Sequence, residues 1–224
     1  MKKMLVFTAF ITALLLFSNT LFAQLTENGD TLIVGPQNSA GEFQGALNEA
    51  IKGDTTATGE RAHTVYKLLP NAQYILTEVI QADFPLEIVA DKVGDGEKLP
   101  VVRCGLNADG SAVNLWWRLF DDATFKNLWI SGINLDGTGP INWISQEMNN
   151  SGNTVSYEGC VVEFPYTWWA MWADWGSANI YKTKDCVFMN IGNPTGTTWN
   201  GAIMNGGTID TVIHQNSTFF NDAN

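Results

Sequence analysis

The sequence predicts an all-β fold: a right-handed parallel β-helix whose coils have three strands and about 26–31 residues, with an N-terminal capping α-helix. Three observations support this fold class. Beyond residue 61, apolar residues alternate with period two in short runs separated by Gly, Asn, Asp and Pro, as in strands joined by tight turns. An internal repeat spans the second half of the chain. A single amphipathic helical pattern precedes both features.

The internal repeat aligns four segments without gaps. They begin at residues 128, 155, 181 and 212 and are therefore spaced by 27, 26 and 31 residues. The fifth residue of each segment is Gly132, Gly159, Asp185 or Asn216, types that tolerate a positive φ. Each segment is interpreted as strand, one-residue bend and strand, and the apolar pairs at 119–120, 144–145, 171–172 and 203–204 supply a third strand. An antiparallel sandwich is the alternative, but it gives no reason for turn residues in register.

The helical pattern lies near the N-terminus. Ser39 and Glu42 have the spacing of a capping box, and Phe43, Leu47 and Ile51 recur at helical intervals. We expect the helix to begin after Ser39 and to end near residue 53, within an entry cap that covers about residues 30–60.

The first residues have the layout of a secretory signal peptide. Lys2 and Lys3 precede the apolar run 5–17, and a small residue, Ala23, stands at the expected cleavage site. The run is too short to span a membrane. We therefore predict a signal peptide over 1–23 and one domain over 24–224, secreted or held at the cell surface. Loss of the two lysines changes the net charge from −11 to −13.

The composition excludes several classes of protein. With 12 Lys and Arg against 23 Asp and Glu, the chain lacks the basic face that a nucleic acid requires. Cys160 and Cys186 share a repeat position, where the strand spacing favours reduced, interior thiols over a disulfide. The two histidines, His63 and His214, lie far from any cysteine in sequence, so no metal site is expected from these residues.

The repeat, together with the helix and the runs at 65–68 and 74–76, resembles the right-handed parallel β-helix proteins of the pectin-lyase-like superfamily. The pattern is also similar to β-helix modules of surface proteins secreted by Bacteroidota-type bacteria. The resemblance covers about residues 30–224 and implies a polysaccharide as partner. Because the sequence stops at Asn224 directly after a strand, we expect the natural chain to continue.

The resemblance also implies candidate catalytic residues. Pectate lyases of this superfamily hold calcium with Asp carboxylates and use Arg or Lys as the base. The resemblance therefore makes Asp121, Asp122, Asp174 and Arg118 candidates, with calcium as the cofactor that it allows. The Gly-His-Gly and Arg-Ile-Lys signatures of polygalacturonases are absent. The alternative interpretation is that these carboxylates are solvated turn residues.

Tryptophans are the second candidate site. Neighbouring side chains on a strand point to opposite faces, so adjacent indoles cannot all enter one core. Exposed indoles would present flat apolar faces to sugar rings, although loops that bury these rings are an equal alternative. The predicted substrate-binding residues are Trp117, Trp168, Trp169, Trp172 and Trp175.

These features predict a secreted monomer that binds a polysaccharide, with its depolymerisation by a lyase or glycosidase as a further hypothesis. The alternatives are a non-catalytic cell-surface adhesin and a structural spacer module. The net charge of −13 would repel a polyanion unless calcium bridged it, which favours a neutral or weakly charged glycan.

Overall fold

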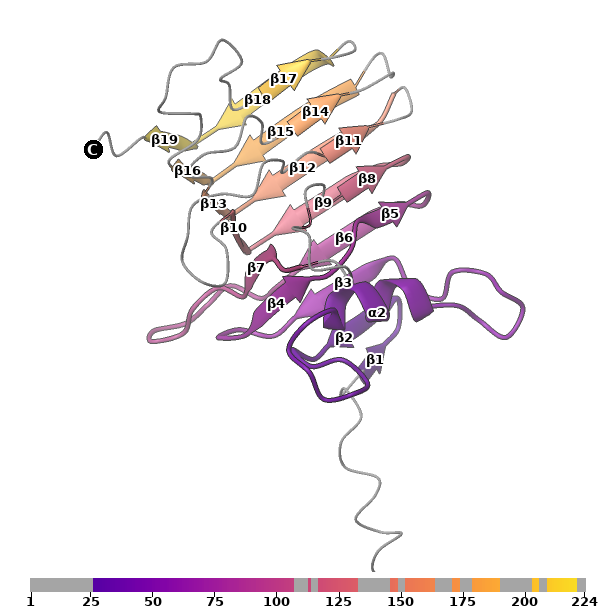
Figure 1. Cartoon of the computed structure of the whole chain (residues 1–224). Coiled ribbons are helices and arrows are strands. Elements are labelled where there is room, and N and C mark those ends of the chain that lie inside the picture. The colour runs from indigo at the N-terminus through magenta and orange to yellow at the C-terminus, as the bar shows by residue number, and fades with distance from the viewer. Residues whose placement is uncertain are drawn as a thin grey trace, which may run out of the picture.

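The structure is a computed structural model that describes residues 26–106, 113, 117–132, 146–148, 152–163, 171–173, 179–189, 203–205 and 209–220. Within these ranges the chain has one α-helix and nineteen β-strands in three sheets (Figure 1). The predicted signal peptide over 1–23 lies outside them. Among the described residues, no helix has the length and apolar character needed to cross a membrane.

Each sheet takes every third strand of the chain, apart from the two extra strands β1 and β2 of the eight-stranded sheet. The eight-stranded sheet contains, in spatial order, β1 (Thr26–Asn28), β2 (Thr31–Val34), β3 (Val65–Leu68), β6 (Leu86–Val89), β9 (Ala123–Lys126), β12 (Thr154–Glu158), β15 (Asn179–Lys184) and β18 (Ile209–Gln215). The six-stranded sheet contains β4 (Gln73–Leu76), β7 (Val101–Cys104), β10 (Trp129–Ser131), β13 (Val161–Glu163), β16 (Val187–Met189) and β19 (Thr218–Phe220). The five-stranded sheet contains β5 (Ile80–Ala82), β8 (Trp117–Leu119), β11 (Gln146–Met148), β14 (Met171–Ala173) and β17 (Ile203–Asn205).

The predicted fold class is wrong. The strands form three flat parallel sheets that are not clearly a parallel β-helix, and no capping helix is evident in the part of the chain that the structure describes. Period-two alternation and turn residues identify strands and their parallel neighbours, but they do not fix the shape that the sheets adopt. The antiparallel sandwich is also excluded, because every pairing between named strands except β1–β2 is parallel.

The helix α2 (Ala46–Gly53) follows two strands instead of preceding the sheets, and it packs on β4 and β2. It begins after Gly45 rather than after Ser39, whose amide donates to Glu49 Oε2 at 3.0 Å. Gly45 has a φ of 75°, and a Cβ there would lie 2.9 Å from Thr77 Oγ1, so this position requires glycine. The predicted end near residue 53 is confirmed.

The repeat is correct in three of its four segments. Val155 pairs with Tyr181, and Tyr181 pairs with Val212, as aligned. On its other side Val155 pairs with Ala123 rather than with Leu128, so the first segment was misaligned by five residues. The turn position is therefore Asn127 instead of Gly132. The four turn residues of the corrected register all have positive φ: Asn127 (54°), Gly159 (62°), Asp185 (54°) and Asn216 (49°).

The turn ladder explains why glycine occupies position 159. Asn127 Nδ2 donates to Ala90 O at 2.8 Å, which fixes the amide beside the next turn. A Cβ on Gly159 would lie 2.5 Å from Asn127 Oδ1. Any other residue at position 159 would therefore displace the amide that links two neighbouring turns.

The third-strand predictions are partly confirmed. β8, β14 and β17 overlap the apolar pairs at 119–120, 171–172 and 203–204. The strand expected at 144–145 is instead β11 at 146–148. The strand was misplaced because Gln146 and Glu147 are polar and do not look like strand residues. In the structure β11 nevertheless lies in the interior of its sheet, between β8 and β14.

The core between the sheets is aromatic and contains reduced cysteines. Ring centroids lie 5.0 Å apart for Trp117 and Phe125 and 5.1 Å apart for Phe125 and Tyr157. Cys160 and Cys186 are buried and free, which confirms the predicted thiols. The Cys160 thiol donates to Phe125 O at 3.3 Å, and burial raises the pKa of this thiol.

Candidate functional site

The predicted aspartates at the end of β8 have a structural role in the described chain. Asp121 Oδ1 accepts the amide of Asp122 at 2.7 Å, and Asp122 Oδ1 accepts the amide of Thr154 at 2.6 Å. The second bond attaches the β8–β9 connection to the start of β12. Arg118 lies at the centre of β8, in register with Gln81 of β5 and position 147 of β11. Hydrogen bonding within the fold accounts for the position of both carboxylates.

The described residues do not fit the calcium site that the resemblance implies. They contain no group of three or more His, Cys, Asp or Glu side chains that could hold a metal ion. Calcium binding requires six to eight oxygen ligands, whereas Asp122 already accepts a backbone amide. No step of a calcium-dependent reaction is therefore derived from these residues.

The predicted tryptophans fall into three groups. Trp117 is only 1% exposed and packs on Phe125, so its ring is part of the core and presents no face to a sugar. Trp172 lies in β14, paired with Glu147 and Met204. The remaining candidates lie outside the described residues: Trp168, Trp169, Trp175 and Asp174.

A groove of about 1230 Å³ lies beside α2. One wall is the segment before the helix, which includes Phe43. The opposite wall is the connection from β4 to β5, around Thr77 and Glu78, together with Leu106, which follows β7. These elements lie beside the indigo end of the chain in Figure 1. The sheets therefore bring together segments that are distant in sequence.

The segment before the helix is shaped by one asparagine. Asn38 Oδ1 accepts the amides of Ala40 at 3.0 Å and Glu42 at 2.8 Å, and Asn38 Nδ2 donates to Gln44 O at 3.0 Å. The expected capping box of Ser39 and Glu42 is therefore not formed, and Asn38 instead accepts the nearby backbone amides. The turn leaves the ring of Phe43 57% exposed at the groove.

The groove combines apolar and acidic side chains. Phe43 and Leu106, which is 52% exposed, supply apolar surface. Glu42, Glu49 and Glu78 supply carboxylates, whereas the lining contains a single basic residue, Lys52. Lys52 Nζ lies 3.2 Å from Glu78 Oε1, and both side chains remain at least half exposed. The lining is therefore acidic overall and offers mostly hydrogen-bond acceptors.

Asn48 fixes the two walls of the groove relative to each other. Its side chain is buried on the helix face that meets the β4–β5 connection. Asn48 Nδ2 donates to Glu78 O at 2.8 Å, and its Oδ1 accepts the amide of Thr77 at 3.0 Å. The nitrogen and the oxygen of the Asn48 side-chain amide therefore both bond to the β4–β5 connection. These two bonds fix the distance between this connection and the helix.

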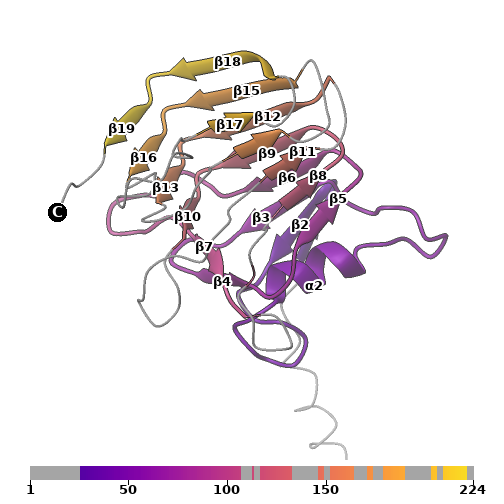
Figure 2. The same cartoon turned by 45° about the horizontal axis from the view of Figure 1, so that its top comes forward.

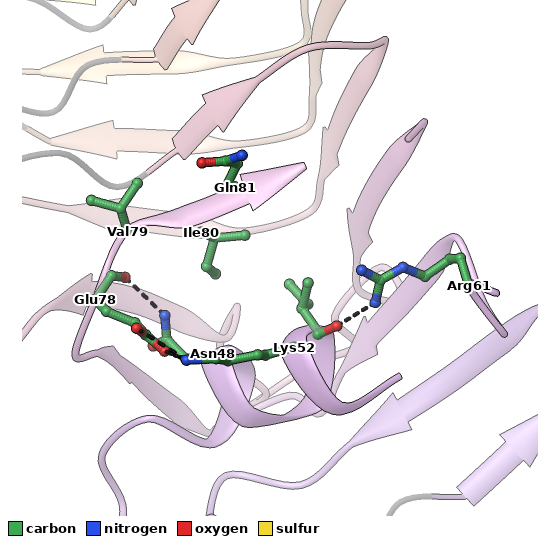
Figure 3. A pocket seen from close by; sticks show the side chains of 8 residues that line it. Asn48, Lys52, Arg61, Glu78, Val79, Ile80 and Gln81 are labelled. Atoms are coloured by element: carbon green, nitrogen blue, oxygen red, sulfur yellow. Dashed lines mark hydrogen bonds and ion pairs between the residues drawn. The ribbon is translucent and has the colours of Figure 1, made fainter. Parts of the chain in front are cut away.

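A smaller hollow of about 240 Å³ lies behind the ion pair and shares Asn48, Lys52 and Glu78 with the groove (Figure 3). Arg61 closes its far side. The Arg61 guanidinium donates to Ile51 O at the end of the helix and lies 4.1 Å from the ring centre of Phe84. The Arg61 loop is thereby attached to the helix.

A buried polar cluster anchors the C-terminal end of α2. Asp54 Oδ2 accepts the hydroxyl of Tyr66 at 2.7 Å and the amide of His63 at 3.0 Å, and His63 Nδ1 lies 2.8 Å from Asp54 Oδ1. Burial raises the pKa of Asp54, but the hydrogen bonds from Tyr66 and His63 outweigh this effect and the pKa is lowered. Burial, then the bond to Asp54, raises the pKa of Tyr66. The cluster therefore holds an ionised carboxylate under the helix end.

Sequence reasoning did not find this site. Two signals were available: Asn48, a polar residue on the apolar face of the helix, and the acidic and histidine side chains that follow it at positions 54 and 63. Phe43 was instead assigned to the helix itself. Comparisons with family models, curated proteins and solved structures find no match to this chain.

Proposed function

We propose that this chain is an exported glycan-binding protein, which holds a neutral saccharide in the groove beside α2. The observation that carries the proposal is the exposed pair Phe43 and Leu106 inside a groove whose lining also includes three carboxylates and three side-chain amides. Sugar rings have apolar C–H faces and a periphery of hydroxyl groups. The groove offers a partner to each of these two surfaces.

The charges of the groove favour a neutral ligand over an acidic one. Three carboxylates line it against one ammonium, and that ammonium is paired with Glu78. A uronate would bring its negative charge toward Glu42 and Glu49, which is unfavourable. The net charge of the whole chain, −11, has the same sign. Hydroxyl groups, in contrast, can donate to these carboxylates.

Binding is favoured over cleavage because the carboxylates already have partners in the fold. Glu78 pairs with Lys52, and Glu49 accepts the amide of Ser39. Asn38 Nδ2 lies 3.5 Å from Glu42 Oε2. Carboxylates held in this way can still accept hydroxyl hydrogens, but they are not arranged as a free pair of acid and base. The apolar run and the predicted cleavage site within 1–23 support export.

Calorimetric titration of the chain with a panel of neutral and uronate-containing oligosaccharides tests this proposal. We expect a neutral oligosaccharide to bind, and Phe43→Ala to weaken binding by about three- to tenfold through loss of ring stacking. Phe220→Ala is the matched control, because this phenylalanine is also exposed but lies on β19. Absence of binding, or equal loss in both variants, would contradict the proposal.

Chromatography of the same mixtures separates binding from depolymerisation. We expect the oligosaccharides to be recovered unchanged after incubation, with and without calcium. Shorter products that depend on the protein would instead support the lyase or glycosidase hypothesis.

A further inference from the structure

The smaller hollow beside α2 is a side pocket of the groove. It measures about 240 Å³ and meets the groove at Lys52 and Glu78, which line both spaces. It lies where α2, the loop after the helix and β5 come together, toward the indigo end of the chain (Figure 2). Pockets that hold a complete small ligand usually measure about 300–1000 Å³. The size of the hollow therefore suits a side group of several heavy atoms, attached to a ligand that lies in the groove.

The boundary between the two spaces is an exposed ion pair. The Lys52 and Glu78 side chains are 75% and 51% exposed, and Lys52 Nζ lies 3.2 Å and 3.5 Å from the two carboxylate oxygens. Exposed pairs of this kind contribute little to stability, and exposed side chains change rotamer rapidly. A side group of a ligand can therefore pass this boundary, while Asn48 keeps the helix and the β4–β5 connection in place.

Three apolar side chains line the hollow. Ile51 of α2 and Ile80 of β5 are buried, and Val79 is 37% exposed. Figure 3 shows Arg61 on the side opposite Glu78, with its guanidinium pointing toward the helix and the hollow. The hollow thus offers contacts for a small apolar group between a carboxylate on one side and a guanidinium on the other.

Arg61 is held in place and keeps hydrogen-bond donors for a ligand. Within the described chain its hydrogen bonds all use Nη1, which donates to Ile51 O, Asp54 O and Tyr66 Oη. The guanidinium also lies over the ring of Phe84. Its Nε and Nη2 donate to no described residue, and the side chain is 25% exposed. An acceptor inside the hollow can therefore bond to Arg61 without displacing the contacts that hold it.

The charges at the hollow favour a neutral acceptor over a carboxylate. Arg61 Nη1 lies 4.0 Å from the ionised carboxylate of Asp54, and Lys52 is paired with Glu78. Two cations and two carboxylates leave no net charge that would attract an anion. A neutral carbonyl oxygen can nevertheless accept from Arg61, and a methyl group can bury its surface against Val79. An acetyl group combines these two features.

The carboxylate of Glu78 favours an acetamido group over an acetate ester. Glu78 lies at the boundary, where a side group in the hollow would join the sugar ring in the groove. The N–H of an acetamido group can donate to this carboxylate, which keeps lone pairs for a second donor beside Lys52. The ester oxygen at the same position has no hydrogen to donate.

We propose that the hollow is an acetamido subsite, and that the saccharide bound in the groove is N-acetylated. The N–H of the acetamido group donates to Glu78, its carbonyl oxygen accepts from Arg61, and its methyl group packs on Val79. The inference rests on the proposed function, because the sugar ring itself lies in the groove. It narrows the ligand class from neutral saccharides to oligosaccharides of N-acetylated hexosamines.

Calorimetric titration with matched oligosaccharides tests the subsite. A chitin oligosaccharide differs from a cellulose oligosaccharide of equal length only in its acetamido groups, and we expect it to bind at least about tenfold more tightly. Equal binding of the two overturns the subsite and leaves the proposed function intact. If no neutral oligosaccharide binds at all, the proposed function fails and the subsite fails with it. An O-acetylated cellulose oligosaccharide that binds as tightly as the chitin one overturns the assignment to an acetamido group.

Filling the hollow provides the matched variant. Val79→Phe should place a larger side chain in the hollow and reduce the preference for the chitin oligosaccharide from at least about tenfold to about twofold or less. Leu69→Phe is the control, because Leu69 is equally exposed, at 37%, but lines neither the groove nor the hollow. This control should retain the full preference. An unchanged preference in Val79→Phe, or the same loss in both variants, contradicts the subsite.

Nuclear Overhauser contacts locate the acetyl group without any substitution. With the chitin oligosaccharide bound, we expect contacts from its acetyl methyl protons to the methyl groups of Val79 and Ile51. Contacts to the ring of Phe43 alone would place the acetyl group in the groove and refute the proposal.

Discussion

The two ends of the eight-stranded sheet differ in how fully their apolar residues are buried. At one end, α2 packs on β4 and β2 and is followed by the Asp54 cluster, and Leu47 of the helix is fully buried. At the other end, Val212 and Phe219 continue the core columns but remain nearly half exposed. The comparison teaches that in-register strand pairing extends the apolar core along the sheets. Full burial of the apolar residues at the end of a sheet, in contrast, requires a further element that packs on them, as α2 does.

Truncation of one apolar side chain at each end should reveal this difference most strongly. Leu47→Ala should lower the free energy of unfolding by about 3 kcal/mol, because it opens a cavity in a buried position. Phe219→Ala removes a larger side chain but should cost only about 1 kcal/mol, since nearly half of the ring is exposed. Urea unfolding of both variants provides the measurement. Equal losses would contradict the contrast between a closed and an open end.

The Asp54 cluster should make the closed end sensitive to acid. Asp54→Asn should cost about 2–3 kcal/mol at neutral pH, because Tyr66 and His63 lose bonds to a charged acceptor. The exposed Asp210→Asn is the control and should change stability by less than about 0.5 kcal/mol.

The direction of the pH effect follows from the lowered pKa of Asp54. The unfolded state binds a proton near the ordinary value of about 3.9, whereas the folded state binds it only at lower pH. The stabilisation is therefore present above about pH 4 and is lost as the pH falls through the folded value. Unfolding curves from pH 7 to pH 3 should show this loss in the wild type and not in Asp54→Asn. Parallel curves would contradict an ionised Asp54.

The turn ladder between the two ends should depend on Gly159. Gly159→Ala should destabilise by about 2 kcal/mol, because its Cβ would meet Asn127 Oδ1 and its φ is positive. Gly152→Ala is the matched control, with a positive φ but with no atom within 4 Å of the added Cβ. Thermal unfolding compares the two. If Asn127→Gly does not relieve the effect of Gly159→Ala, the clash is not its cause.

The ion pair at the groove should have the smallest effect on stability. Lys52→Ala should change the free energy of unfolding by about 0.5 kcal/mol or less, since the Lys52 side chain is 75% exposed. Chemical unfolding at low and high salt measures it. A loss well above 1 kcal/mol would show that the pair, and not Asn48, fixes the walls of the groove.

The sequence predicted local features better than their arrangement. Most strands follow from period-two alternation, and three turn residues follow from residue types that tolerate positive φ. The reduced thiols follow from the repeat position that Cys160 and Cys186 share. The fold class was wrong, because a repeat determines which strands are neighbours but not the shape of the sheets. Gly132 was assigned to the turn position that Asn127 occupies, since both residue types suit a turn and only the strand pairing distinguishes them.

The groove could not be predicted because its walls come from distant segments. Phe43 fits the helical periodicity of Leu47 and Ile51, and only the turn around Asn38 removes it from the helix. Leu106 reaches the groove through the pairing of β7 with β4. Neither placement has a signature in the local sequence.

The measurement that tests the central claim most directly is an amide chemical-shift map of the chain during titration with the neutral oligosaccharide that binds most tightly. The account predicts that the largest shifts fall on Phe43, Gln44, Thr77 and Leu106, while Val212 and Ile213 are unaffected. Shifts concentrated on β18 and β19, or on the outer face of the five-stranded sheet around Arg118, would contradict a saccharide site beside α2.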